Sequence, residues 1–289
     1  AEVTRLVDEA LEGRLRNSIS DQSRSNETRD LLARIEAIEN EFTDIDLSTQ
    51  LSKFFDAFSE LTNNPQDMSL RTLAIQQSDT LSRFVNDIRN EYAALREQTH
   101  DQFGHAVQAV NELLGKIDTL NHRIARQSAG GGGSPGLRDQ RGVALAELSE
   151  YMDLSIVETE TGLVDVYVGS LPVILNGSSR GIEVHKHTQD GELVLDVIIG
   201  DDKSKLDINS GKLSAMIDFK DNGLNQAIDT LDTFASQLIW QVNRLHSEGQ
   251  GTAAFTELTS ATQNLDPDAA LNNLEANNLG FAAGHGSFE

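Results

Sequence analysis

A histidine pair is the arrangement in this chain that comes nearest to a reactive site. His185 and His187 are separated by one residue, so on an extended strand both side chains point to the same face. That is the spacing of many zinc ligands, but a zinc site needs three or four of them. The sequence contains no cysteine, and Asp190 is predicted to lie in a turn. The pattern favours two exposed histidines on an edge strand, and no metal site is predicted.

Other patterns that carry chemistry are incomplete. Gly169-Ser170 is followed by Leu171-Pro172, not by the second glycine of a nucleophile elbow. The acidic pair Asp201-Asp202 lies beside Lys203 and Lys205, which favours a solvated turn over a catalytic pair. The histidines predicted to lie in helices are His100, His105, His122 and His246. None has the repeated carboxylate spacing of a di-iron helical bundle. The sequence therefore predicts no catalytic, cofactor or metal site and no enzyme.

A glycine-rich tract, Gly130 to Gly133 followed by Ser134-Pro135-Gly136, raises the question of phosphate binding. A phosphate-binding loop requires a following Gly-Lys-Ser/Thr and a preceding buried strand. Neither is present, so the tract is predicted to be a flexible connection.

The composition narrows the classes of partner. Acidic residues outnumber basic ones by 46 to 23, which gives a formal net charge of −23. Binding to nucleic acid or to an anionic membrane depends on clustered lysine and arginine, so neither is predicted. No apolar run approaches the roughly 20 residues of a membrane span. The first residues also lack the basic and apolar regions of a signal peptide.

The elements around these residues are mostly helices with a narrow apolar seam. Two heptad-patterned stretches run from about Asp67 to Arg126 and from Lys212 to His246. A break is predicted near Thr99 to Gly104, because one helix of the first stretch's length would be unusual. Asn64 is predicted as the N-cap of this stretch, with Pro65 at its first helical position. The second stretch repeats apolar residues at spacings of four and three: Leu224, Ile228, Leu231, Ala235, Leu238, Val242 and Leu245.

Shorter helices and a β region complete the chain. Helices are predicted within 1–42, 51–61 and 137–152, the last with Val143, Leu145, Ala146 and Leu148 inward. Alternating residues predict strands within 154–158, 163–168, 172–175, 182–187 and 193–199, with glycines at the turns. The fold class is α+β, an elongated, rod-like α-helical bundle with a small inserted antiparallel β domain. The predicted domains are a discontinuous helical one (1–136 and 211–249), the insert with its short helix (137–210), and an incomplete further domain (250–289).

Several blocks, in order along the chain, resemble the bacterial flagellar hook-filament junction protein family, the first hook-associated proteins of the flagellin and hook-associated superfamily. The blocks are Phe54–Asp67, Arg71–Phe84, Val110–Ile124, Leu137–Ser149, Gly211–Asp221 and Gln241–Gly249. Two positions depart from the family pattern: Gly142 stands for an acidic residue and Lys220 for an arginine. The insert between Leu137 and Gly211 favours this family over flagellin and the second junction protein.

The resemblance implies a structural protein that joins hook to filament and allows the filament to assemble on the hook. It implies contacts with the hook protein and the second junction protein, self-association in a ring when full length, and a family export chaperone. It also implies type III export, an extracellular location in the flagellum and a role in motility, without a cofactor. The family's terminal polymerisation helices have no counterpart here, so a soluble, monomeric core fragment is expected.

Two alternatives stay open at this point. One is a helical sensor or receptor ectodomain whose β insert binds a ligand, which requires a concave polar pocket. The other is a metal hydrolase that uses His185 and His187. Stoichiometric zinc, lost when both histidines are changed, would support the second alternative.

Overall fold

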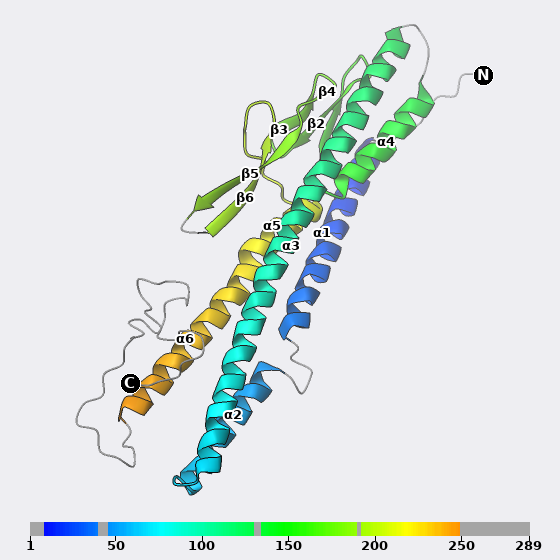
Figure 1. Ribbon diagram of the computed structural model, residues 1–289. Coiled ribbons are helices and arrows are strands. Elements are labelled where there is room, and N and C mark those ends of the chain that lie inside the picture. Colours follow the sequence, from blue (N-terminus) through cyan, green and yellow to red (C-terminus); the bar gives the residue numbers. More distant parts are fainter. Residues whose placement is uncertain (1–8, 40–45, 130–133, 190–191, 249–289) are drawn as a thin grey trace. The chain divides into compact units, whose positions relative to one another are not determined.

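The fold is known from a computed structural model that describes residues 9–39, 46–129, 134–189 and 192–248 (Figure 1). Its helices are α1 (Glu9–Glu39), α2 (Leu47–Asn63), α3 (Met68–Ala129), α4 (Pro135–Ser149), α5 (Gly211–Asp218), the π-helical segment η1 (Phe219–Leu224) and α6 (Asn225–Glu248). Its strands are β1 (Ser155–Glu158), β2 (Val164–Val168), β3 (Leu171–Leu175), β4 (Ser178–Ser179), β5 (Ile182–Gln189) and β6 (Glu192–Ile199). The predicted α+β class, helices with an inserted antiparallel β region, is confirmed.

The chain divides into two compact units. Unit 1 comprises Ala1–Arg34 and Leu95–Asp221, and unit 2 comprises Ile35–Ala94 and Asn222–Glu289. The division of the sequence into a helical domain, an insert and a further domain stays a prediction. The glycine tract 130–133, the predicted turn at Asp190 and Gly191, and the predicted further domain 250–289 lie outside the described residues.

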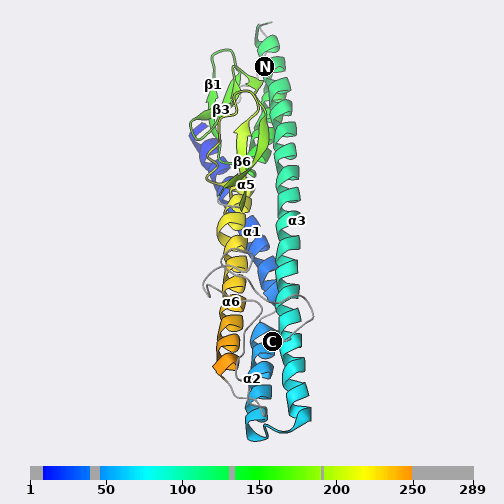
Figure 2. The same cartoon turned by 60° about the vertical axis from the view of Figure 1, so that its left-hand side comes forward.

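Helix α3 is a single helix of 62 residues, so the predicted break near Thr99 to Gly104 is wrong (Figure 2). Gly104 lies within the helix, where one glycine costs only about 1 kcal/mol. The apolar seam continues across the predicted break and compensates for that cost. Its buried members are Leu81, Ile88, Tyr92, Leu95, Phe103, Val107, Val110, Leu114, Ile117 and Ile124. Thr99, also buried, donates its hydroxyl hydrogen bond to the Leu95 carbonyl and needs no other partner.

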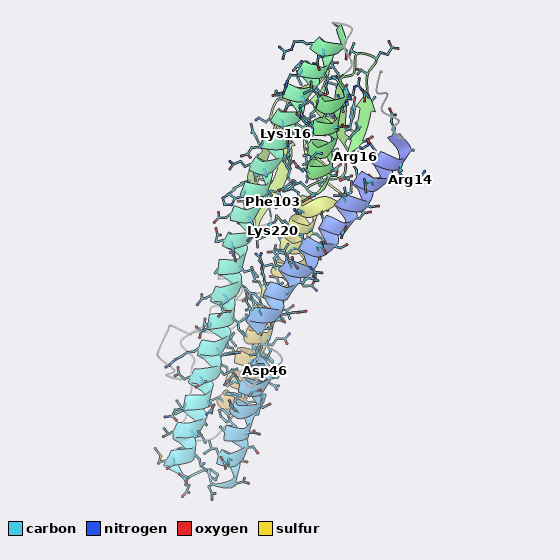
Figure 3. The ribbon with its side chains drawn as sticks, turned by 90° about the vertical axis from the view of Figure 1, so that its right-hand side faces the viewer. Arg14, Arg16, Asp46, Phe103, Lys116 and Lys220 are labelled. Atoms are coloured by element: carbon cyan, nitrogen blue, oxygen red, sulfur yellow. The ribbon has the colours of Figure 1, made fainter. Side chains whose placement is uncertain are left out.

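The start of α3 also differs from the prediction. Asn64 ends α2 instead of capping α3, and its carbonyl accepts a turn hydrogen bond from the Asp67 amide at 3.0 Å. Asp67 is the residue that caps α3, since its carboxylate accepts from the Ser69 amide at 2.7 Å and its carbonyl from the Arg71 amide. Helix α2 starts earlier than predicted, behind Asp46, whose carboxylate accepts from the Thr49 amide at 2.7 Å (Figure 3).

The return helix is not uniform. The stretch predicted as one helix contains η1 between α5 and α6. Within it the seam is buried from Leu224 to Ala235, but Leu245 at the far end is 60% exposed. Helix α4 also departs from its predicted inner face. Ala144 is fully buried, whereas Val143 is 56% exposed.

The β region forms two separate antiparallel sheets, both in unit 1. Strands β1 to β4 pair in sequence order, and β5 pairs only with β6. The very short β4 was not predicted; the five strands that the sequence predicts are all present. The four-stranded sheet lies along α3 in both ribbon views, and Asn111 on α3 bonds the backbone of Ile182 at the start of β5 (Figures 1 and 2).

A neck closes the β region where the chain enters and leaves it. We define the neck as Glu150, Tyr151, Gly211, Lys212 and Leu213. The Lys212 amide donates to the Glu150 carbonyl at 2.9 Å, and the Leu213 amide donates to the Tyr151 carbonyl at 3.1 Å. Gly211 has φ +86°, and a Cβ there would lie 2.4 Å from the Tyr151 carbonyl carbon. The neck therefore requires glycine at this position.

Candidate functional site

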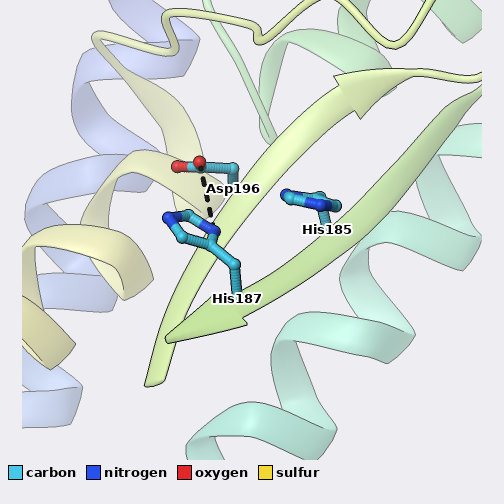
Figure 4. A group of neighbouring side chains, drawn as sticks. All are labelled: His185, His187 and Asp196. Carbon is cyan, nitrogen blue, oxygen red and sulfur yellow. Dashed lines mark ion pairs between the residues drawn. The ribbon is translucent and has the colours of Figure 1, made fainter. Parts of the chain in front are cut away.

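The two histidines of the sequence motif lie together on the β5–β6 hairpin. Ile182 pairs with Ile199, and this register places His185 directly opposite Asp196. Side chains that face each other across an antiparallel pair share a face of the sheet, and so do residues two apart on one strand. His185, His187 and Asp196 therefore project from the same face (Figure 4).

The geometry of this cluster is close. The donor atoms of the three side chains all lie within 4.8 Å of one another. The two imidazole rings are stacked, with centroids 5.2 Å apart and an interplanar angle of 25°. His187 Nδ1 is 3.7 Å from Asp196 Oδ2, and Lys205 Nζ is 2.8 Å from the other carboxylate oxygen. Among the residues that the structure describes, these three form the one group of His, Cys, Asp or Glu side chains close enough to hold a metal ion together.

Sequence reasoning did not identify Asp196. The signal that could have found it is Asp190-Gly191, because two strands joined by Asp-Gly read as a hairpin with a two-residue connection. That connection length sets the register and pairs His185 with Asp196. The prediction that the pair is exposed holds for His185, whereas His187 is only partly exposed.

A buried polar network holds the four-stranded sheet to α3 and α4. Asn121, fully buried, donates to the carbonyls of Val164 and Gly177 at 2.9 and 3.1 Å. Its own Oδ1 accepts from Arg141 Nη1 at 2.9 Å and from the Val164 amide. Asn121, on the buried seam of α3, thus bonds the backbone of the β region at Val164 and Gly177.

Arg141 extends this network from α4. Its side chain is 4% exposed, and Nη1 also donates to the Gly162 carbonyl at 2.7 Å. Nη2 donates to Glu158 on β1 at 3.2 Å, and Arg138 bonds the same carboxylate. A guanidinium group with several fixed donors can satisfy several acceptors at once. The arrangement is suited to positioning, since every polar group named here is occupied by another.

A second histidine is buried on α3. His100 is 7% exposed, its Nε2 has no hydrogen-bond partner, and burial lowers its pKa. It lines a small cavity with Thr99, Phe103, Leu195, Met216, Ile217 and Lys220. Phe103 and Lys220 are labelled in Figure 3. About 10 Å³ of this cavity is open to a water-sized sphere, which is the space of roughly one water molecule. It is far smaller than the ~300 Å³ or more of a typical ligand pocket.

The remaining candidates are separate from these groups. Asp202 accepts a 2.6 Å hydrogen bond from Arg180, and this bond together with the Ser204 amide lowers the pKa of Asp202 to about 2. Asp201 is 3.5 Å from the same guanidinium, so Arg180 contacts both carboxylates of the acidic pair and offsets one of their two negative charges at an exposed turn. His122 is 3.6 Å from Asp118 and 3.1 Å from the Ser178 hydroxyl. Among the described helices, none is long and apolar enough to cross a membrane.

Comparison with known protein families gives one model that matches most of the chain. It is described as the helical domain of the flagellar hook-associated protein FlgK, and it matches residues 32–256. The matched range includes α2, α3, the whole β region and α6.

Curated relatives and a solved structure agree with this match. Flagellar hook-associated protein 1 of Bacillus subtilis (strain 168) is 24% identical over 245 residues, covering 75% of this chain and 48% of the relative. Its namesake in Escherichia coli (strain K12) is 25% identical over 214 residues, covering 70% of this chain and 39% of the relative. The flagellar hook junction protein FlgK from Burkholderia pseudomallei has a similar fold, with a TM-score of 0.71 at 20% identity. That likeness covers 86% of this chain and 47% of the other. The chain thus spans less than half the length of these proteins.

Proposed function

The chain belongs to the family of the FlgK helical domain, and from that premise we propose that it is a structural part of a bacterial flagellum, acting where hook and filament meet. The observation that carries the proposal is the match over residues 32–256, which includes both heptad-patterned stretches and the β region between them. The sensor alternative gains no support, because the family is one of structural flagellar proteins and the cavity beside His100 has room only for water.

A protein that joins two parts of a flagellum needs rigid, well-packed elements and does not need an active site. Helix α3 contributes a continuous helical stretch to each unit, and its buried seam keeps each stretch helical. The Asn121–Arg141 network fixes the sheet on the unit 1 part of this helix through buried hydrogen bonds. A subunit built in this way would transmit force through packed side chains without a step of bond chemistry.

The proposed partners follow from the same role. They are the hook protein on one side, the second junction protein on the other, further copies of the full-length chain in a ring, and an export chaperone before secretion. The net charge of −23 keeps free subunits apart by self-repulsion until they meet a template. We propose an extracellular location in the flagellum, reached by type III export.

Deletion and complementation test the proposal. The gene that encodes this chain is deleted in the source organism and returned at full length, and hooks and filaments are viewed by electron microscopy. We expect bare hooks and secreted flagellin in the deletion strain, and attached filaments after complementation. Normal attached filaments in the deletion strain would refute the junction role.

A further inference from the structure

We propose that His185, His187 and Asp196 form a binding site for a divalent transition-metal ion, of which Zn²⁺ is the type, and that the bound ion clips β5 to β6. The two histidines come from β5 and the carboxylate from β6, so one ion would join the two strands. The site is separate from the proposed junction role and does not depend on it.

The separation of the donor atoms supports a bridging ion. His187 Nδ1 and Asp196 Oδ2 are 3.7 Å apart, which is too long for a hydrogen bond. Two ligand atoms on one tetrahedral zinc, each 2.0–2.2 Å from the ion, lie about 3.4 Å apart. The spacing of His187 and Asp196 therefore needs a shift of a few tenths of an ångström to accept a metal. The donor atom of His185, which lies within 4.8 Å of the other two, must move closer by up to about 1.4 Å.

An unsatisfied nitrogen points to the same place. His187 Nδ1 is buried and has no hydrogen-bond partner, although it faces the carboxylate (Figure 4). Buried polar atoms almost always have a partner, so one without a partner calls for a missing group. A cation bound between Nδ1 and the carboxylate would satisfy both.

The groups around the three ligands leave room for a metal ion and for a water molecule as a fourth ligand. Lys205 Nζ forms an ion pair with Asp196 Oδ1 at 2.8 Å and leaves Oδ2 available to the metal ion. Ligating carboxylates are commonly held by a second partner in this way, and the nearby positive charge keeps the affinity moderate. His185 is exposed, so a fourth position is open to water. Two imidazoles and one carboxylate select Zn²⁺, Ni²⁺ or Cu²⁺ over Ca²⁺ and Mg²⁺.

A cross-strand ion would add to the stability of the hairpin. Strands β5 and β6 form their own two-stranded sheet and do not pair with the four-stranded one. Burial of Leu195, Val197 and Ile199 already stabilises the hairpin. A cross-strand ion adds its binding free energy to the paired state. The site is thus structural and differs from the hydrolase alternative, which requires a substrate beside the metal.

Isothermal titration calorimetry of the untagged chain at pH 7.5 tests the site, with ZnCl₂ as the probe and MgCl₂ as the comparison. We expect saturable binding of one zinc per chain and none of magnesium under the same conditions. His185→Ala, His187→Ala and Asp196→Asn should each weaken zinc binding at least about tenfold, since loss of even a supporting partner costs 10–100-fold. Hydrogen exchange of the β5 and β6 amides should slow with zinc.

Matched controls keep the result interpretable. His122→Ala removes an exposed histidine that also faces an aspartate, and its zinc affinity should equal that of the unaltered chain. Circular dichroism without metal shows whether each variant is folded, and His185→Ala, at an exposed position, is the variant expected to fold in every case. No saturable zinc binding, or equal binding by the folded His185→Ala variant, would overturn the proposal and leave only an ion pair between His187 and Asp196.

Discussion

Buried polar side chains in unit 1 differ in whether hydrogen bonds replace the water that they lose on folding. Asn121 and Arg141 lose water but gain hydrogen bonds to backbone carbonyls and to each other. His100 loses water and gains no bond at Nε2. The first pair can be buried at any pH, whereas burial of the second is compatible only with the neutral ring.

The pH dependence of stability should reveal His100. Burial lowers its pKa in the folded chain, and the nearby Glu97 opposes this shift only in part. The unfolded chain therefore binds a proton more readily, and the free energy of unfolding should fall as the pH is lowered through about 6.5. Stability from the neutral ring is present above that pH and lost below it.

Urea denaturation of the unaltered chain and of His100→Asn at pH 7.5 and pH 5.5 measures this effect. The loss of stability between the two pH values should be smaller in His100→Asn. The matched control is His105→Asn, at an exposed position on the same helix. An equal pH dependence in the unaltered chain and His100→Asn would contradict the assignment.

At the scale of elements, glycine acts in opposite ways along the chain. Gly104 and Gly115 lie inside α3 with nothing within 4 Å of an added Cβ, so they weaken the helix without serving a contact. Gly211 lies in the neck at φ +86°, where an added Cβ meets the backbone of Tyr151 and Met152.

Alanine substitution should separate these roles. Gly104→Ala and Gly115→Ala should each raise the free energy of unfolding by about 0.5–1 kcal/mol. Gly211→Ala should lower it by more than about 2 kcal/mol, through the left-handed backbone and the backbone clash. Thermal and urea denaturation followed by circular dichroism measure all three. A Gly211→Ala variant as stable as the unaltered chain would show that the neck can relax.

The sequence predicts most elements because their patterns are local. The spacing of apolar residues from Leu81 to Ile124 indicates which face of the helix is buried, and the alternation of residues in the strands does the same for the sheets. The helical continuity across Gly104, the π-helical segment η1 and the cap at Asp67 depend on packing and on competing local hydrogen bonds. A local sequence pattern does not show which of the competing interactions is stronger, so these three features could not be predicted from it.

The candidate metal site shows the same limit. The His185–His187 spacing is visible in one strand, but Asp196 joins it only through the register of a second strand. The 3.7 Å spacing and the buried Nδ1 are properties of the folded chain. The pairing of His185 with Asp196 could be predicted from Asp190-Gly191. The distances between the donor atoms and the burial of Nδ1 could not.

For the whole molecule, the main question is whether the two units unfold together. Each unit is made from two separate stretches of chain, and α3 contributes residues to both. Each also has its own buried ion pair or network. In unit 2, Arg89 Nε lies 3.0 Å from Asp232, whose side chain is 2% exposed.

Leu231→Asp tests this question. Leu231 is 6% exposed in unit 2, and a carboxylate there has no partner to offset its loss of water. Hydrogen exchange should show lost protection in α2 and in residues 70–90 of α3, with β2 and residues 105–124 still protected. The matched control is Leu245→Asp on the same helix, at a position 60% exposed. Loss of protection throughout the chain would mean one cooperative unit.

The neck separates the length of the β region from the spacing of the two helices that it joins. The end of α4 and the start of α5 are joined by the Lys212–Glu150 and Leu213–Tyr151 backbone hydrogen bonds. These two helices therefore meet the same two chain ends whatever the length of the turns between them. Lengthening a flexible connection costs only about 0.6 kcal/mol per doubling, so the exposed turns of the β region can grow while the neck stays closed. The backbone that bonds Asn121 and Arg141 is constrained more tightly, because its removal would break hydrogen bonds of two buried side chains.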